Sequence, residues 1–242
     1  NYLENSKHNK MKNILLIGGS YGIGLAIAKE LQYENKVYIA SRTNEAISDM
    51  NVTHIPFDAA TDTLNTSLLP EVIDGFVYCP GSINLRPFRG LKPEAFESDL
   101  QINFISMIKA LQSVLPNLSA ANQSSVVLFS SVAAGMGMPF HTSVAAAKGA
   151  IEGFAKALAA EYAPKIRVNV IAPSLTDTPL AEKFLSNEEK KEKSAQRHPL
   201  KRVGTPEDMA KTSKFLLSED SSWISGQIFH VDGGMSTLLV NQ

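Results

Sequence analysis

The sequence contains a single cysteine among 242 residues, and its formal net charge is only −1. Cys79 therefore has no partner for an internal disulfide, and we expect a protein of the reducing cytoplasm. The near balance of charge provides no broad basic field, which argues against nucleic acid as a partner. No apolar run approaches the ~18 residues that a membrane-spanning helix requires, so no membrane partner is expected either.

The composition is that of a globular protein with an ample core, because hydrophobic residues make up 44% of the chain and charged residues 19%. The length suits one α/β domain. The polar stretch before Met11 lacks the apolar core of a signal peptide. We interpret residues 1–11 as a native extension or a cloning remnant and expect residues 12–242 to form the domain.

Apolar runs of strand length alternate with helical patterns along the chain. Strands are expected at residues 14–17, 37–40, 52–57, 72–78, 126–129, 168–171 and 228–231. These runs are continuously apolar, as in a sheet that helices cover on both faces. The alternation predicts an α/β protein with a single-domain Rossmann fold, a doubly wound parallel sheet of about seven strands.

The helical patterns carry further hints about surfaces. Helices are expected at residues 22–31, 93–115 and 143–162, and small residues are frequent in the last of these. A core helix explains part of that pattern. A subunit interface explains the rest, because the apolar surface extends nearly all round the helix. The charged stretch 182–193 indicates a solvated helical face or, alternatively, a mobile lid over a substrate cleft.

A glycine-rich loop, Gly18-Gly-Ser-Tyr-Gly22-Ile-Gly24, joins the first expected strand to its helix. Gly18 allows a tight turn, Gly22 lets the backbone approach a pyrophosphate, and Gly24 lets the helix pack closely on the sheet. The N-terminus of the helix offers free N–H groups and a positive dipole end to the phosphates. In this position the loop predicts a dinucleotide site rather than an ordinary turn.

The second expected strand ends at Ser41 and Arg42, without the acidic residue that usually binds the ribose hydroxyls of NAD. Ser41 and Arg42 are instead suited to a 2′-phosphate, which Arg42 would bind through charge-assisted hydrogen bonds. NADP(H) is therefore the preferred cofactor and NAD(H) the alternative. The other interpretation is that Arg42 only caps a loop.

The stretch Val144-Ala-Ala-Ala-Lys148 is the most informative part of the sequence. Together with the glycine-rich loop and with Ser131 after the fifth expected strand, it resembles the short-chain dehydrogenase/reductase family. The 3-oxoacyl-carrier-protein-reductase-like branch is the most similar. The resemblance extends from about residue 12 to about residue 235, and it includes Asn103 and the motifs at residues 169–174, 202–207 and 226–234.

The resemblance implies that Ser131, Lys148 and Asn103 are the catalytic residues and that Val144 occupies the usual position of a proton-transferring Tyr. In the family the Ser binds the substrate oxygen, the Lys holds the nicotinamide ribose, and the Asn supports a water. No metal is expected. The residues implied for the cofactor site are Gly18, Ser20, Tyr21, Gly22, Ile23, Gly24, Ser41, Arg42, Asp58, Ala59, Cys79, Pro80, Gly81, Lys148, Pro173, Ser174, Thr176 and Thr178.

A valine side chain transfers no proton, so another group must do so if the protein is an enzyme. Lys148 with a depressed pKa is one candidate, and a water that joins Ser131 to Lys148 is a second. A side chain from elsewhere is the third: His141, Tyr78 or Tyr21. For these three we favour an exposed loop residue, a packing residue and a neighbour of the cofactor phosphates, respectively.

Two functions follow from this reading. The first is an NADP(H)-dependent oxidoreductase that acts on a small carbonyl or alcohol with non-standard proton delivery. The alternative is a non-catalytic NADP(H)-binding scaffold or sensor, favoured by Val144 and by the loss of two family asparagines before Gly81. An enzyme should keep an open cavity lined by Ser131, whereas a scaffold can let Val144 close it.

In either case we expect a homo-oligomer, a tetramer or a dimer. We interpret Val144 as natural, because alanine is the usual inactivating substitution.

Overall fold

The computed structural model describes residues 11–240, so the predicted extension at residues 1–11 lies, apart from Met11, outside the described residues. All strands of the sheet are parallel, in the order β3-β2-β1-β4-β5-β6-β7. Their bounds are β1 (Lys12–Ile17), β2 (Asn35–Ser41), β3 (Val52–Pro56), β4 (Gly75–Tyr78), β5 (Ser124–Phe129), β6 (Ile166–Pro173) and β7 (Ile228–Val231). The predicted single-domain Rossmann fold is confirmed.

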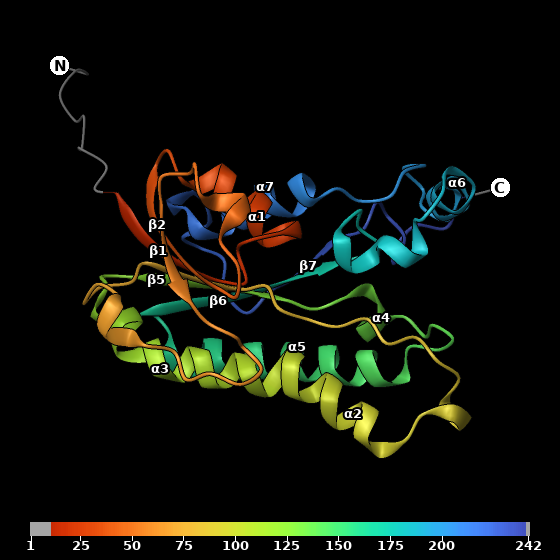
Figure 1. Cartoon of the computed structure of the whole chain (residues 1–242), viewed down its shortest axis with the longest axis horizontal. Coiled ribbons are helices and arrows are strands. Elements are labelled where there is room, and N and C mark those ends of the chain that lie inside the picture. The colour runs from red at the N-terminus through yellow and green to blue at the C-terminus, as the bar shows by residue number, and fades with distance from the viewer. Residues whose placement is uncertain (1–10, 241–242) are drawn as a thin grey trace.

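Helices cover both faces of the sheet (Figure 1). On one face lie α1 (Gly22–Leu31) and α7 (Pro206–Leu217), and on the other α3 (Ser106–Ala120) and α5 (Thr142–Tyr162). The remaining α-helices are α2 (Pro93–Leu100), α4 (Val132–Gly135) and α6 (Glu188–Gln196). Shorter helical turns are η1 (Glu45–Ile47), η2 (Thr66–Leu68), η3 (Phe88–Gly90), η4 (Gln101–Ile105), η5 (Pro179–Phe184) and η6 (Glu219–Ser221). Within the described residues, no helix is long and apolar enough to span a membrane.

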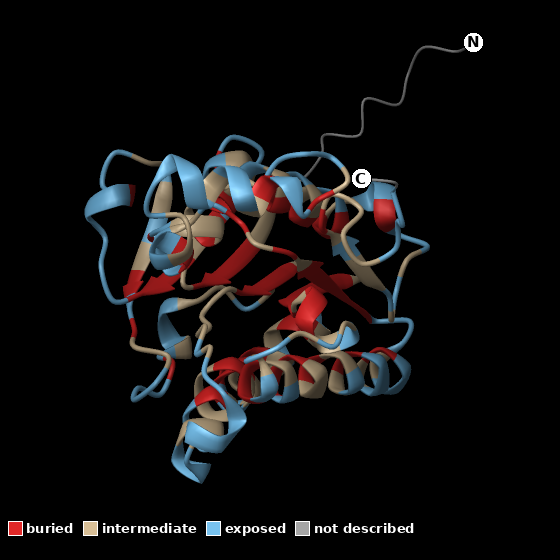
Figure 2. Cartoon of the chain, turned by 90° about the vertical axis from the view of Figure 1, so that its right-hand side faces the viewer, coloured by how far each residue is buried: buried red, intermediate tan, exposed pale blue. Residues whose placement is uncertain are grey.

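The sheet separates two apolar cores, and successive residues of each strand enter them in turn. In β1, Leu15 and Ile17 pack in the core on the α3 and α5 side, whereas Ile14 and Leu16 pack in the core on the α1 and α7 side. Both faces of the central strands β1, β4, β5 and β6 are therefore largely buried, whereas the edge strands β3 and β7 are partly exposed (Figure 2). This two-sided burial explains why the strands are continuously apolar in the sequence.

The helix expected at residues 93–115 differs from the structure. It is divided into α2 and α3 by η4, a π-helical turn, and it continues through Pro116 to Ala120. A π turn adds one residue to the helical repeat and so changes which side chains face the sheet. Proline usually ends a helix, but here the turn after it carries Leu118, which is fully buried in the core. Tertiary packing thus overrides the local signal.

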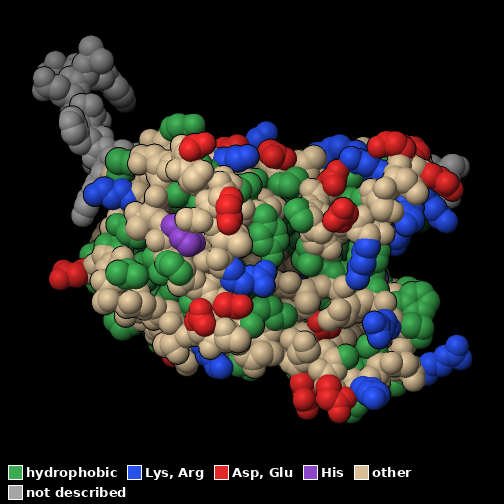
Figure 3. All heavy atoms as spheres, viewed as in Figure 1, with side chains coloured by type: hydrophobic (Ala, Val, Ile, Leu, Met, Phe, Trp, Pro, Cys, Tyr) green, Lys and Arg blue, Asp and Glu red, His purple; other side chains and the backbone are tan. Residues whose placement is uncertain are grey.

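The charged segment after β6 forms η5 and α6, and most of its side chains are exposed. This exposure agrees with the solvated helical face expected there. Acidic and basic side chains are interspersed over the face of the molecule in Figure 3. One ion pair attaches the segment to the rest of the domain, since the Nζ atom of Lys191 lies 2.6 Å from a carboxylate oxygen of Asp177.

Candidate active site

The carboxyl ends of β1, β2 and β4 border a cavity of about 740 Å³, at the point where the strand order reverses. We call it the cofactor cleft. Most residues predicted to bind the cofactor line it: Gly18, Ser20, Tyr21, Gly22, Ile23, Gly24, Ser41, Arg42, Asp58, Ala59, Cys79, Pro80, Gly81 and Thr178. The other four, Lys148, Pro173, Ser174 and Thr176, line a neighbouring cavity.

The glycine-rich loop has the backbone conformation that its glycines predict. Gly18 and Gly22 have φ angles of +81° and +56°, in the region that favours glycine. A Cβ atom on Gly24 would lie 2.1 Å from the carbonyl oxygen of Gly18, so glycine there permits α1 to approach the loop itself rather than the sheet. Tyr21 provides no side-chain cap to α1, which leaves the first N–H groups of the helix available to an anion.

The two residues expected to bind a 2′-phosphate differ in their surroundings. Ser41 is buried, and its hydroxyl donates to the main-chain oxygen of Thr43 at 2.8 Å. Thr43 in turn donates to the hydroxyl of Ser20 at 3.1 Å. This chain of hydroxyls ties the end of β2 to the glycine-rich loop. Arg42 is exposed and lines the cofactor cleft, so its guanidinium is the cation at this end of the site.

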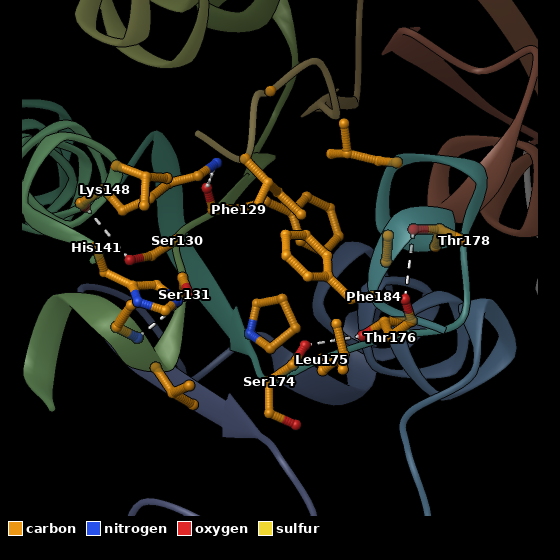
Figure 4. Close-up of a pocket in the computed structure, with 18 of the residues that line it drawn as sticks. Phe129, Ser130, Ser131, His141, Lys148, Ser174, Leu175, Thr176, Thr178 and Phe184 are labelled. Atoms are coloured by element: carbon orange, nitrogen blue, oxygen red, sulfur yellow. Dashed lines mark hydrogen bonds between the residues drawn. The ribbon is translucent and has the colours of Figure 1, made fainter. Parts of the chain in front are cut away.

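A second cavity of about 330 Å³ adjoins the cofactor cleft and shares Ile23, Cys79, Gly81, Thr178 and Leu180 with it. We call it the substrate cavity. Ser131, His141 and Lys148 lie on one side of it, and the segment from Leu175 to Thr178 lies with Phe184 on the other (Figure 4). The structure therefore brings Ser131, Val144 and Lys148 together at one wall, as their spacing predicts.

Ser131 begins α4, and its Oγ atom accepts a hydrogen bond from the Ala133 N–H at 3.2 Å. A hydroxyl has one hydrogen to donate and two lone pairs with which to accept. The capping bond uses a lone pair only, so the hydrogen of Ser131 remains available to a ligand in the substrate cavity. This arrangement suits donation to a carbonyl oxygen.

Lys148 is 9% exposed, and Val144 is 5% exposed one helical turn before it on α5. The Nζ atom of Lys148 donates to the main-chain oxygen of Phe129 at 2.9 Å. Burial lowers the pKa of Lys148 to about 8, although nearby Cys79 and Asp99 act in the opposite direction. Burial also raises the pKa of the Cys79 thiol to about 12, which excludes a reactive thiolate near neutral pH.

Asn103 is fully buried in the π turn and lies behind the wall of the site. Its Nδ2 atom donates to the main-chain oxygen of Asp99 and to the Ser82 hydroxyl, both at 2.8 Å. A Cβ atom on Gly81 would lie 2.9 Å from Asn103 Oδ1 and 3.4 Å from Lys148 Nζ. Glycine at position 81 thus leaves room for the amide oxygen of Asn103 behind this loop, close to the Lys148 ammonium.

The three side chains considered as substitute proton donors occupy different places. His141 lies in the loop before α5, as expected, but it is half-buried rather than exposed and lines the substrate cavity. The hydroxyl of buried Tyr78 donates to the main-chain oxygen of Ile102 at 2.7 Å, as expected for a packing residue. Tyr21 lines the cofactor cleft, beside the glycine-rich loop.

Several polar residues around the substrate cavity have no motif in the sequence that identifies them. His198 is 3% exposed, and its two ring nitrogens lie 2.9 Å from Ser174 Oγ and from the main-chain oxygen of Ser194. Because a carbonyl oxygen only accepts, Nδ1 carries the hydrogen and Nε2 of the neutral ring accepts from Ser174. Ser130 likewise donates to Glu152 Oε1 at 2.6 Å. Neither pair is marked in the sequence, since 24 and 22 residues separate the partners.

Comparisons with known proteins agree with this architecture. A sequence profile for the family described as enoyl-(acyl carrier protein) reductase matches residues 18–236. A 3-oxoacyl-[acyl-carrier-protein] reductase from Chlamydia muridarum is 34% identical over 244 residues, which cover 93% of this chain and 97% of that protein.

Solved structures are similar over nearly the whole chain. Ligand-free aldohexose dehydrogenase from Thermoplasma acidophilum has a TM-score of 0.87 at 25% identity, covering 97% of this chain and 99% of that one. ElxO with NADP bound has a TM-score of 0.85 at 25% identity, covering 94% and 100%. With its seven-stranded parallel sheet and the extent of the sequence match, the chain belongs to the short-chain dehydrogenase/reductase family.

Proposed function

We propose that the protein is an NADP(H)-dependent oxidoreductase that acts on a small carbonyl or alcohol and delivers the proton without a tyrosine. The observation that carries this proposal is the pair of adjoining cavities. One is lined by the glycine-rich loop and Arg42, and the other by Ser131 and Lys148. Such an arrangement brings a cofactor and a substrate into contact where the two cavities share their walls.

The cofactor cleft fits a dinucleotide phosphate in its shape and charge. The uncapped N-terminus of α1 and the open backbone at Gly22 would hold the pyrophosphate, and Arg42 the 2′-phosphate. Asp58 would contact the adenine, Lys148 the nicotinamide ribose, and Thr178 the carboxamide. When bound, NADP(H) supplies the hydride. The NADP bound to ElxO, a structural relative, supports this choice of cofactor.

In the proposed reaction, the Ser131 hydroxyl donates to the oxygen of the substrate carbonyl and orients it in the substrate cavity. Valine stands at the position of the general acid, so Val144 contributes only an apolar wall. Lys148 then provides the proton, directly or through a water bound to Ser131. A pKa of about 8 suits this role, because a general acid works best when its pKa lies near the operating pH.

His141 is a second source of the proton within this proposal. It lines the same cavity, and its Nδ1 atom is held by the main-chain oxygen of Pro139 at 2.7 Å.

A substrate that needs less help from an acid, such as a quinone or an activated double bond, would suit the same site. The largely apolar walls, including Ile83, Leu175 and Phe184, favour an apolar substrate body.

A non-catalytic NADP(H)-binding scaffold is the second candidate, and Val144 is the residue that favours it. The open substrate cavity supports the enzyme instead. Val144 lines that space without filling it, and the Ser131 hydroxyl donates to no partner within the described residues.

We also propose a homo-oligomer. A Cβ atom on Gly149 or Gly153 of α5 would meet no other atom within 4 Å, so this face of the helix is open to a second subunit.

A direct binding titration with NADPH and NADH, followed by cofactor fluorescence or calorimetry, tests the proposal. Micromolar or tighter binding of NADPH is expected, with NADH at least about tenfold weaker because one charge-assisted contact is worth ~1.5 kcal/mol or more. Absence of binding by either cofactor would overturn the oxidoreductase proposal. With binding established, NADPH oxidation in the presence of apolar ketones and quinones separates the enzyme from the scaffold.

A further inference from the structure

A fully buried carboxylate, Asp99 of α2, joins two segments that build the wall of the substrate cavity. Its Oδ1 atom accepts from the Ser82 hydroxyl at 2.5 Å and from Asn84 Nδ2 at 2.7 Å, in the loop after β4. Its Oδ2 atom accepts from the Ser143 hydroxyl at 2.6 Å, in the first turn of α5. The Ser143 hydroxyl also lies 3.2 Å from the main-chain oxygen of Ala95, but its single hydrogen suits the shorter contact to Asp99. Ser82, Asn84 and Ser143 can thus each donate to the carboxylate, which is the pattern that an ionised carboxyl group requires.

The same cluster reaches the π turn that carries Asn103. The Ser82 hydroxyl donates to Asp99 and accepts from Asn103 Nδ2, while the Ser82 N–H donates to Asn103 Oδ1 at 3.3 Å. Ser82 therefore passes the orientation of Asp99 on to the Gly81 loop, against which Lys148 Nζ lies. The carboxylate is thus linked to α5 at Ser143 and to the loop that faces Lys148.

Asp99 takes part in no direct ion pair among residues 11–240. A carboxylate without exposure to water is costly unless it is hydrogen bonded and its charge is compensated nearby. The buried ammonium of Lys148 is close enough to feel this charge, since the attraction of Asp99 raises the pKa of Lys148 against the larger effect of burial. The other titratable groups around Lys148 come from the residue after β4, from α5 and the residue before it, and from the far side of the cavity: Cys79, Glu152, His141, Arg197 and His198.

We propose that Asp99 is a positioning residue that holds the wall of the substrate cavity together and supplies the buried negative charge that keeps Lys148 protonated. Val144 offers no ionisable group to Lys148, so the charge comes from α2 instead. The proposal deepens the proposed function, on which the role of Lys148 as a proton donor rests. The coupling between Asp99 and Lys148 is a property of the cofactor-free protein.

The test is a titration of Lys148 by NMR in protein labelled with ¹³C at lysine Cε, with the signal assigned by its loss in Lys148→Met. The protein carries no cofactor or substrate, so failure of NADPH to bind leaves the result intact. In Asp99→Asn, which keeps the shape of the side chain, the midpoint for Lys148 should fall by about one pH unit. Ser143→Ala is the matched control, because it removes one hydrogen bond and keeps the charge.

A lower midpoint in Asp99→Asn with an unchanged midpoint in Ser143→Ala supports the proposal. Unchanged midpoints in both variants overturn it, and an equal fall in both assigns the effect to packing rather than to charge, which overturns it as well. If Asp99→Asn does not fold, Asp99→Ser serves in its place, since a hydroxyl can still accept from one of the three donors.

Discussion

The ammonium group of Lys148 donates a hydrogen bond to the main-chain oxygen of Phe129, and 2.9 Å separates the two atoms. Phe129 is the last residue of β5, and Ser131 follows two residues later. The bond therefore anchors the side chain from α5 at the strand end that carries the hydroxyl. Because the partner is a backbone atom, the position of the ammonium does not depend on the side chain at position 144.

The first prediction concerns Val144→Tyr. In the proposed function this change supplies the missing general acid, and it should raise kcat/KM for ketone reduction with NADPH by ~10² or more. Val144→Phe is the matched control, because it introduces the same ring without the hydroxyl. Equal rates in the two variants would show that the geometry of the cavity, and not the proton donor, limits the reaction.

Gly22→Asp should abolish cofactor binding, because the new carboxylate would face the pyrophosphate at the N-terminus of α1. The fold should survive, since Asp tolerates the φ of +56° and a Cβ atom there would approach Thr178 no closer than 3.7 Å. Gly22→Asn has nearly the same shape without the charge and should lose much less affinity. The measurement is the NADPH titration, with circular dichroism as the check on folding. Unchanged NADPH affinity in Gly22→Asp would contradict the assignment of the loop.

Arg42→Ala should weaken NADPH about tenfold or more and leave NADH nearly unchanged, because only NADPH carries the 2′-phosphate that the guanidinium would bind. Arg42→Lys keeps the charge but not the planar fork of the guanidinium, so its affinity for NADPH should lie between those of the wild type and Arg42→Ala. Both affinities are measured in the same titration. An equal loss for NADPH and NADH would show that Arg42 supports the loop instead.

Lys148→Met should stabilise the protein at neutral pH, because the cost of burying the ammonium exceeds its attraction to Asp99. The pKa of Lys148 is lowered from 10.5 to about 8, chiefly by burial, so below pH 8 the folded protein carries a buried charge at a cost of up to a few kcal/mol. Between pH 8 and 10.5 the folded state loses this proton before the unfolded state does. The stability of the wild type should therefore rise there, and the advantage of Lys148→Met should shrink.

Urea unfolding at pH 7 and pH 10 measures this difference. Lys156→Met, at an exposed position of the same helix, is the control and should have little effect at either pH. A loss of stability in Lys148→Met at pH 7 would indicate that the hydrogen bond to Phe129 outweighs the cost of the buried charge.

Asp208→Asn should lower the free energy of unfolding at pH 7 by about 1–2 kcal/mol. Asp208 accepts two hydrogen bonds from Arg202, at 2.6 and 2.9 Å, and forms a capping box with Thr205 at the start of α7. The bond from Arg202, the largest effect, lowers the pKa of Asp208 from 3.8 to about 2. This stabilisation is complete above the ordinary pKa and is lost as the pH falls through about 2.

The difference in free energy of unfolding between wild type and Asp208→Asn should accordingly narrow below pH 4 and be mostly lost by about pH 2. Urea unfolding over this range measures it. Glu207→Gln, one residue earlier in the same turn and exposed, should show no such dependence. A constant difference down to pH 2 would rule out the carboxylate as its source.

The sequence by itself determined the order of strands and helices and the position of the glycine-rich loop. These features depend on neighbouring residues: continuous apolar runs for strands buried on both faces, and glycines at the turn between β1 and α1. The spacing from Ser131 to Lys148 also carried over into space, because the chain after β5 returns through α4 and a short loop into α5, which packs on the sheet (Figure 1).

Only the tertiary structure decided how those residues are supported. The π turn around Asn103, the continuation of α3 through Pro116 and the pairing of His198 with Ser174 arise from packing between segments far apart in the chain. The buried charge of Asp99 and the pKa of Lys148 depend on desolvation and on neighbours in three dimensions. A linear pattern identifies which groups are present, whereas folding sets the distances and burial that determine their chemistry.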